Sequence, residues 1–161
     1  MGSGKSAPWP PLLDEIRRAV LHVVEGRSGP LPTMTNHFVG KRVLIVEDEH
    51  IVALDIASKV TTRGGVVIGP VGTVDGALKA IKNSDVDGAI VDINLRGTLG
   101  FEVADALADR HIPFVFVTGY DAGAVPARHA EVIRVEKPVT PDFVCRALKA
   151  ALAARSIHLV T

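Results

Sequence analysis

Short apolar runs along the chain alternate with longer segments in which apolar residues recur every three or four positions. Predicted strands that contain these runs cover residues 42–46, 66–70, 87–91, 113–117 and 132–135. A continuous apolar run such as Val43–Val46 is typical of a strand that is buried on both faces, as in a parallel sheet. We therefore predict five strands, the first of them buried on both faces.

The segments between these runs have the periodicity of amphipathic helices. The predicted helices cover residues 50–63, 74–83, 100–110, 122–130 and 141–154. The prediction is weakest for 122–130, because Gly123 and Pro126 disfavour a helix. Strands that alternate with helices indicate an α/β fold with a doubly wound (βα)5 parallel sheet. For this sheet we expect the flavodoxin-like strand order 2-1-3-4-5.

An additional amphipathic helix is predicted near the N-terminus, at about 10–25. Its apolar stripe consists of Leu13, Ile16, Val20 and Val23. This helix either packs on its own domain or joins two chains in a homodimer, because the same spacing also suits a coiled coil. The predicted domain division is an N-terminal extension over 1–40, a globular domain over 41–155 and a tail over 156–161.

Composition narrows the classes of function. Of the 161 residues, 47% are hydrophobic and 22% charged, and the formal net charge is zero, so we expect a packed core and no nucleic-acid partner. No apolar run approaches the length of a membrane span, and no secretory signal is present, so a soluble cytoplasmic protein is expected. The single cysteine, Cys145, excludes an internal disulfide and is predicted to be buried on a helix.

Chemically active residues follow the ends of four predicted strands. Glu47, Asp48 and Glu49 follow the first strand, Asp92 the third, Thr118 the fourth and Lys137 the fifth. In a doubly wound sheet the carboxyl ends of the strands share one edge, and ligands bind there. We therefore expect Glu47, Asp48, Asp92, Thr118 and Lys137 to converge on one pocket.

The pocket's residue types are suited to phosphoryl chemistry. Adjacent carboxylates repel one another unless a cation lies among them, and Mg²⁺ prefers such oxygen ligands. A carboxylate can attack a phosphoryl group, while a lysine and a hydroxyl stabilise the charge on its oxygens. Each residue also has a simpler interpretation: the acids can cap the following helix, and Asp92 can be an ordinary turn residue.

Four motifs in this order resemble the receiver domain of response regulators, the phosphoacceptor module of two-component signalling. They are Val46-Glu47-Asp48-Glu49, Val91-Asp92-Ile93-Asn94-Leu95, Val117-Thr118-Gly119 and Glu136-Lys137-Pro138. The resemblance covers about residues 41–155. Each motif alone is common, but four in order at strand ends are specific.

The resemblance implies a role for each pocket residue. Asp92 would accept a phosphoryl group from a histidine kinase or a histidine phosphotransfer protein. Asp48 and Asp92 would bind Mg²⁺ directly, Glu47 would bind it through water, and the backbone carbonyl of Asn94 would complete the metal site. The phosphoryl oxygens would be bound by Thr118 and Lys137, and the Lys137–Pro138 peptide bond would be cis.

The chain departs from the family pattern at two positions. Arg96 precedes Gly97 where the family often has Pro-Gly, and Arg134 stands where many members have an aromatic switch residue. The switch candidates are therefore Thr118, Tyr120 and Arg134. The segment Phe116–Tyr120 partly resembles a subgroup named for a Phe-Ala-Thr-Gly motif, whose members also tend to lack the switch aromatic.

The favoured function is a stand-alone response regulator, which is a signalling phosphoprotein rather than an enzyme acting on a separate substrate. Phosphorylation would change the surface of segments 122–130, 132–135 and 141–154, and thereby the affinity for a downstream protein. One alternative is the receiver of a hybrid histidine kinase. Another is a Mg²⁺-dependent aspartyl-phosphate phosphohydrolase, disfavoured because Asn94 stands where such enzymes place a second acid.

Overall fold

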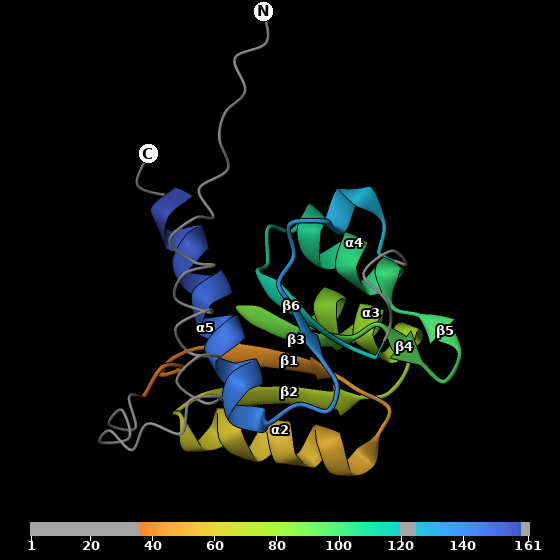
Figure 1. Ribbon diagram of the computed structural model, residues 1–161. Helices are drawn as coiled ribbons and strands as arrows, with labels where there is room; N and C mark the ends of the chain where they lie inside the picture. The colour runs from red at the N-terminus through yellow and green to blue at the C-terminus, as the bar shows by residue number, and fades with distance from the viewer. Residues whose placement is uncertain (1–35, 120–124, 159–161) are drawn as a thin grey trace, which may run out of the picture. The chain divides into compact units, whose positions relative to one another are not determined.

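The strands form one parallel sheet of five and a separate two-stranded hairpin. A computed structural model describes residues 36–119 and 125–158, so the predicted helix at 10–25 and Tyr120 lie outside the described residues. The parallel sheet has the order β2-β1-β3-β6-β7, which confirms the predicted order (Figure 1). Its strands are β1 (Arg42–Val46), β2 (Val66–Val71), β3 (Gly88–Asp92), β6 (Phe114–Thr118) and β7 (Arg134–Glu136).

Helices cover both faces of the sheet, as the alternating pattern predicts (Figure 1). On one face lie α2 (His50–Thr62) and α5 (Pro141–His158), and on the other lie α3 (Val74–Asn83) and α4 (Phe101–Asp109). The last helix continues four residues beyond the predicted end at 154, because no glycine or proline follows Pro141 to stop it. Among the described residues, no helix has both the length and the apolar character needed to cross a membrane.

Two hydrophobic cores follow from the alternation of side chains along the strands. In β1, Leu44 and Val46 belong to the core under α3 and α4, whereas Val43 and Ile45 belong to the core under α2 and α5. All four are fully buried. A continuous apolar run is therefore required, because both faces of this strand are covered.

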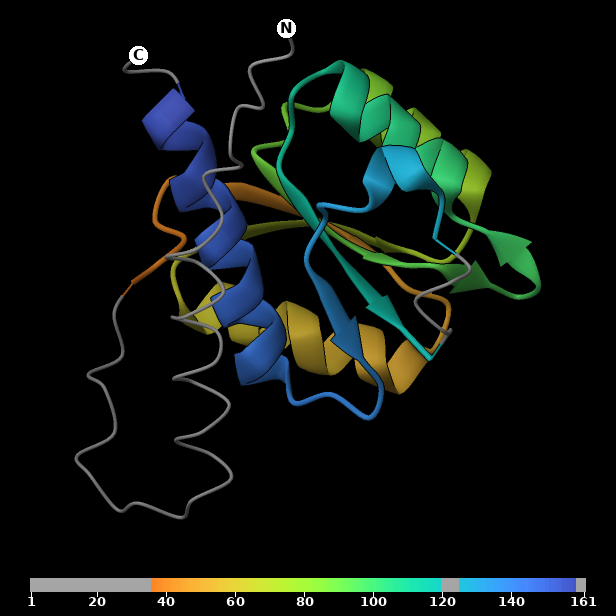
Figure 2. The same cartoon turned by 45° about the horizontal axis from the view of Figure 1, so that its top comes forward.

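A short antiparallel hairpin follows Asp92 and is absent from the sequence-based prediction. It consists of β4 (Asn94–Leu95) and β5 (Thr98–Leu99), joined by the two-residue turn Arg96–Gly97. Both turn residues have positive φ, 53° and 84° respectively. Figures 1 and 2 show that this hairpin lies at the carboxyl edge of the parallel sheet. Its strands are too short to give an alternating pattern, so periodicity cannot find them.

The helix predicted at 122–130 is wrong over the part of that segment that the structure describes. Residues 125–130 contain only a 3₁₀ turn, η2 (Ala127–His129), preceded by Pro126 in an extended conformation. Proline disfavours the helical conformation in the residue before it and removes a backbone donor. The turn continues into a hydrogen bond from Val132 N to His129 O, and β7 begins two residues later than predicted.

Side chains attach this 3₁₀ turn to α4. Arg128 donates two hydrogen bonds to the Asp105 carboxylate, at 2.7 and 3.0 Å, and lowers the pKa of that carboxyl. Asp105 Oδ1 also lies 2.7 Å from Nε2 of the buried His129. The His129 ring packs edge-on against Phe114 and Phe116 of β6. These contacts connect the segment before β7 to the strand that ends at Thr118.

We expect Asp105→Ala to loosen this attachment. Removing the carboxylate leaves the buried His129 without its hydrogen-bond partner, a loss of about 1 kcal/mol in the free energy of unfolding. Urea titration followed by circular dichroism measures this loss. Asp109→Ala, an exposed acid at the end of the same helix, is the matched control. Equal stability of the two variants would contradict the proposed attachment.

The single cysteine gives a second test of the fold. Cys145 is fully buried on α5, as predicted, and burial raises the pKa of its thiol to about 11. Because the thiolate is the reactive form, we expect a disulfide reagent at pH 8 to react about 100-fold more slowly with the folded protein than in urea. Equal rates in the two conditions would contradict this packing of α5.

Candidate functional site

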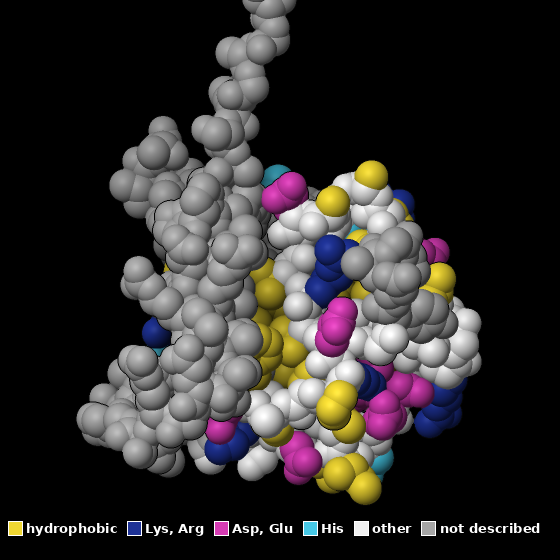
Figure 3. Space-filling model, in the orientation of Figure 1, with side chains coloured by type: hydrophobic (Ala, Val, Ile, Leu, Met, Phe, Trp, Pro, Cys, Tyr) yellow, Lys and Arg dark blue, Asp and Glu magenta, His cyan; other side chains and the backbone are white. Residues whose placement is uncertain are grey.

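A cavity of about 480 Å³ opens at the carboxyl edge of the parallel sheet, where the four motifs predicted a pocket. The cavity is lined by Asp48, Glu49, Asp92, Asn94, Arg96, Gly119 and Lys137. Parallel pairing of β1, β3, β6 and β7 places their carboxyl ends side by side. In Figure 3, Asp and Glu side chains gather beside Lys and Arg side chains over this edge.

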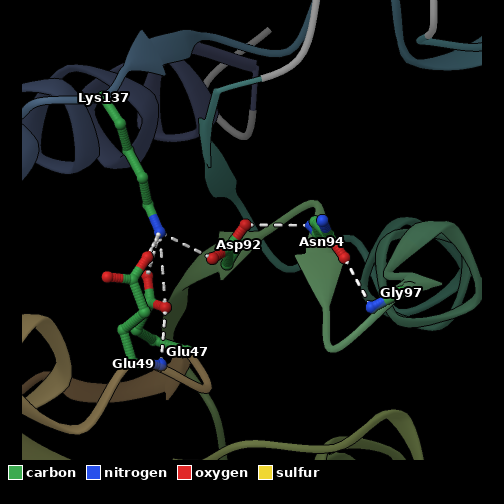
Figure 4. Close-up of polar contacts among 6 residues, drawn as sticks. All are labelled: Glu47, Glu49, Asp92, Asn94, Gly97 and Lys137. Carbon is green, nitrogen blue, oxygen red and sulfur yellow. Dashed lines mark hydrogen bonds and ion pairs between the residues drawn. The ribbon is translucent and has the colours of Figure 1, made fainter.

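Lys137 is the cation at the centre of the site (Figure 4). Its Nζ lies 2.6 Å from Glu49 Oε1, 2.9 Å from Asp92 Oδ2 and 3.2 Å from Glu47 Oε2. Burial by itself lowers the pKa of Lys137, but the hydrogen bonds to Asp92 and Glu49 outweigh it and raise this pKa above its ordinary range. Lys137 is therefore a permanent positive charge, placed where three carboxylates would otherwise repel one another.

Glu47 is the buried member of the acidic motif. Burial raises the pKa of its carboxyl to about 7, although a hydrogen bond from Glu49 N to Oε1, at 3.0 Å, favours the charged form. Its Oε2 is buried and accepts no hydrogen bond of good geometry, even with Lys137 Nζ nearby. A buried carboxylate oxygen without a donor is costly, and a cation would satisfy it.

Asp92 is fixed through both carboxylate oxygens. Oδ2 accepts from Lys137 Nζ, and Oδ1 accepts from the backbone N–H of Asn94 at 2.9 Å (Figure 4). The chain after the hairpin returns close to Asp92, since a Cβ added at Gly100 would lie 2.9 Å from the Asp92 carbonyl oxygen. Only glycine allows that approach. The Asp92 side chain is 4% exposed, so it is oriented by its partners rather than by solvent.

The carboxylates also fit a divalent cation. One oxygen from each of Glu47, Glu49 and Asp92 lies within 4.8 Å of the other two. Carboxylate oxygens are the ligands that Mg²⁺ prefers, and the unsatisfied Glu47 oxygen is available to it or to a water in its shell. The residues therefore fit Mg²⁺.

The sequence-predicted residues occupy different positions around this site. Asp48 and Asn94 line the cavity, but Glu49, which we did not predict as a ligand, belongs to the close carboxylate group. Its contact with Lys137 could only be suspected from the run of three acids. The direct metal contact of Asp48 and the carbonyl ligand from Asn94 remain predictions.

Of the hydroxyl and switch candidates, the structure describes two. Thr118 is buried at the end of β6, and its carbonyl accepts a hydrogen bond from Lys137 N at 2.9 Å. Arg134 begins β7 opposite Phe116, and Tyr120 lies outside the described residues. The Lys137–Pro138 peptide bond is cis, as the resemblance implies.

Comparison with known proteins agrees with this geometry. The model of the response regulator receiver domain matches residues 43–149. The chain belongs to the response-regulator receiver family. The solution structure of SdrG from Sphingomonas melonis Fr1 is 41% identical, with a TM-score of 0.62, and the match covers 70% of this chain and 96% of SdrG.

Curated relatives of this receiver domain are longer proteins. Phyllosphere-induced regulator PhyR of Methylorubrum extorquens is 32% identical over 114 residues, which are 68% of this chain and 43% of PhyR. Regulatory protein VanR of Enterococcus faecium is 35% identical over 81 residues, which are 50% of this chain and 35% of VanR. The chain thus spans less than half the length of the curated relatives that it matches.

The buried Glu47 carboxylate is expected to lower the stability of the metal-free protein and to increase the stabilisation that Mg²⁺ confers. Because the pKa of folded Glu47 lies above its unfolded value, ionised Glu47 destabilises the metal-free protein as pH rises from about 4.5 to 7. We expect Glu47→Gln to raise the free energy of unfolding in EDTA at pH 8 by about 1–2 kcal/mol, and the gain to vanish below about pH 4.5. The same change should reduce the stabilisation that Mg²⁺ confers.

Urea titrations at pH 8 and 4.5, with EDTA or Mg²⁺, measure both effects. Glu131→Gln removes an exposed glutamate outside the cavity and serves as the matched control. A loss of stability in EDTA for Glu47→Gln, or an undiminished effect of Mg²⁺, would contradict the account of this carboxylate.

Proposed function

We propose that this receiver domain is a phosphorylation switch in which Asp92 accepts a phosphoryl group from a phosphohistidine of a kinase or phosphotransfer protein. The observation that supports this most is the way the Asp92 carboxylate is held. Asp92 lines the cavity, and its carboxylate accepts from Lys137 on one oxygen and from the Asn94 N–H on the other. A positioned carboxylate beside a fixed cation suits attack on an anionic phosphorus.

In the proposed transfer, an Asp92 Oδ forms a bond to phosphorus while the bond from phosphorus to the donor's imidazole nitrogen breaks. The electron pair of the broken bond stays on the imidazole, and the product is an aspartyl phosphate. Lys137, already within 2.9 Å of Asp92, would neutralise charge on the transferred oxygens, and the Thr118 hydroxyl would donate to one of them. When bound, Mg²⁺ supplies further neutralisation of the phosphoryl charge.

Asp92 phosphorylation would redistribute the partners of Lys137. Three carboxylates now share this ammonium group, and a phosphoryl group on Asp92 would compete with Glu47 and Glu49 for it. Lys137 lies in the segment between β7 and α5, and its backbone N–H donates a hydrogen bond to the carbonyl of Thr118 in β6. A change here would therefore reach the surface of η2, β7 and α5, where we propose that a downstream protein binds.

A phosphohydrolase is less consistent with the site. Such an enzyme needs an acid two residues after the nucleophile to protonate the leaving group. Asn94 holds that position, and its Oδ1 is engaged by Gly97 N at 2.7 Å. The same chemistry would serve a stand-alone regulator or a receiver of a hybrid kinase, and identification of the donor distinguishes them.

The direct test is intact-mass spectrometry after incubation with Mg²⁺ and acetyl phosphate. We expect the mass of one phosphoryl group to be added to the wild-type protein and to Asp85→Asn, and none to Asp92→Asn. Asp85 is the matched control, because it is an exposed aspartate in the loop before β3, at the opposite edge of the sheet.

A folded, Mg²⁺-binding protein that gains no phosphoryl group from acetyl phosphate or from a phosphorylated histidine kinase would contradict the proposal. Equal labelling of Asp92→Asn would place the acceptor elsewhere.

A further inference from the structure

Arg96 lines the cavity from the hairpin that follows Asp92. Among the residues that the structure describes, it is the second cationic residue of the cavity lining, beside Lys137. Unlike Lys137, it stands on a turn rather than at the end of a strand of the parallel sheet, so its position depends on the geometry of the hairpin.

The backbone at Arg96 is unfavourable for an arginine. Its φ of 53° lies in the left-handed region, where residues other than glycine, asparagine and aspartate are strained. Two-residue hairpin turns with positive φ at both positions strongly favour asparagine or aspartate before the glycine. Turn chemistry therefore does not account for arginine here, and strain of this kind gathers at functional sites.

The hairpin is tied to the acceptor carboxylate. Asn94 N donates to Asp92 Oδ1 at 2.9 Å, and Asn94 Oδ1 accepts from Gly97 N at 2.7 Å. Figure 4 shows Asn94 lying between Asp92 and Gly97. Gly100 N closes the base of the hairpin with a bond of 2.7 Å to the Ile93 carbonyl. These hydrogen bonds thus fix the position of the turn that carries Arg96 relative to Asp92.

The carboxylates that surround Lys137 already compensate its positive charge, so a phosphoryl group on Asp92 would need a further cation. Lys137 is already shared by Glu47, Glu49 and Asp92. A phosphoryl group adds further negative charge to this side of the cavity. The guanidinium of arginine presents several donors in a planar fork that matches the oxygens of phosphate.

We propose that Arg96 is a second cationic ligand of the phosphoryl group on Asp92, acting beside Lys137. This inference rests on the proposed phosphorylation of Asp92. Arg96 donates from the hairpin side of the cavity, whereas Lys137 donates from the β7 side. The strained turn places Arg96 in the lining of the cavity that Asp92 also lines.

The test measures binding of beryllofluoride, an analogue of the phosphoryl group, in the presence of Mg²⁺ by ¹⁹F NMR. We expect Arg96→Ala to weaken binding by about 5- to 20-fold, the effect of one charge-assisted hydrogen-bonding group. Arg96→Lys should be intermediate, because it keeps the charge and loses the fork. The effect of Arg96→Ala should shrink as salt is raised, since Arg96 is exposed.

Arg96→Asn separates binding from folding. Asparagine tolerates positive φ, so this variant should have a higher Tm than the wild type and still bind beryllofluoride as weakly as Arg96→Ala. Arg42→Ala is the control, because Arg42 is an exposed arginine at the amino end of β1, the opposite edge of the sheet.

The outcomes separate the two proposals. If the wild-type protein binds beryllofluoride and both Arg96→Ala and Arg96→Asn bind it with the same affinity, the role of Arg96 is overturned. Phosphorylation of Asp92 would be unaffected by that result. An equal loss in Arg42→Ala would also overturn it, because the effect would then be one of overall charge. Wild-type protein that binds no beryllofluoride would overturn both proposals.

Discussion

The contact of one lysine with three carboxylates is the interaction on which the site depends. Glu47, Glu49 and Asp92 come from the ends of two strands and the start of a helix. Lys137 lies close to all three carboxylates and compensates their mutual repulsion. The compensation is incomplete, since burial raises the pKa of Glu47 to about 7 and one of its oxygens accepts no good hydrogen bond. The Glu47 oxygen could therefore bind a further cation, and Lys137 could bind a new anionic group.

The parallel sheet makes this arrangement possible. Continuous apolar strands, buried on both faces, place charged residues only where the strands end. Two cores on opposite faces of the sheet bury β1, β3 and β6. The carboxyl edge therefore collects residues that are 45 and 90 positions apart in the chain, as the contacts of Lys137 with Asp92 and Glu47 show.

The sequence was informative where one physical rule dominates. Apolar runs and helical periodicity predicted the five parallel strands, and the polar residues at strand ends predicted a pocket at the carboxyl edge. The strand order followed from the expected flavodoxin-like fold and not from periodicity. Periodicity could not predict the hairpin after Asp92, whose strands have two residues each. It also predicted a helix before β7, where Pro126 and the tertiary contacts of His129 with Asp105 leave a 3₁₀ turn.

Within the acidic motif, sequence alone could not show which side chains turn toward Lys137. Glu49 makes the shortest of these contacts, and Asp48 lines the cavity beside it. Spacing along the chain does not determine side-chain direction at a strand-to-helix junction, so this distinction needs coordinates.

We propose that a phosphoryl group on Asp92 takes Lys137 away from the neighbouring carboxylates. A crystal structure of the protein with Mg²⁺ and beryllofluoride would test this proposal through the distances from Lys137 Nζ. We expect an adduct on Asp92, with Lys137 Nζ in hydrogen-bond contact with one of its fluorines and the 2.6 Å contact with Glu49 lost. An adduct on Asp92 that leaves Lys137 paired with Glu49 would contradict it.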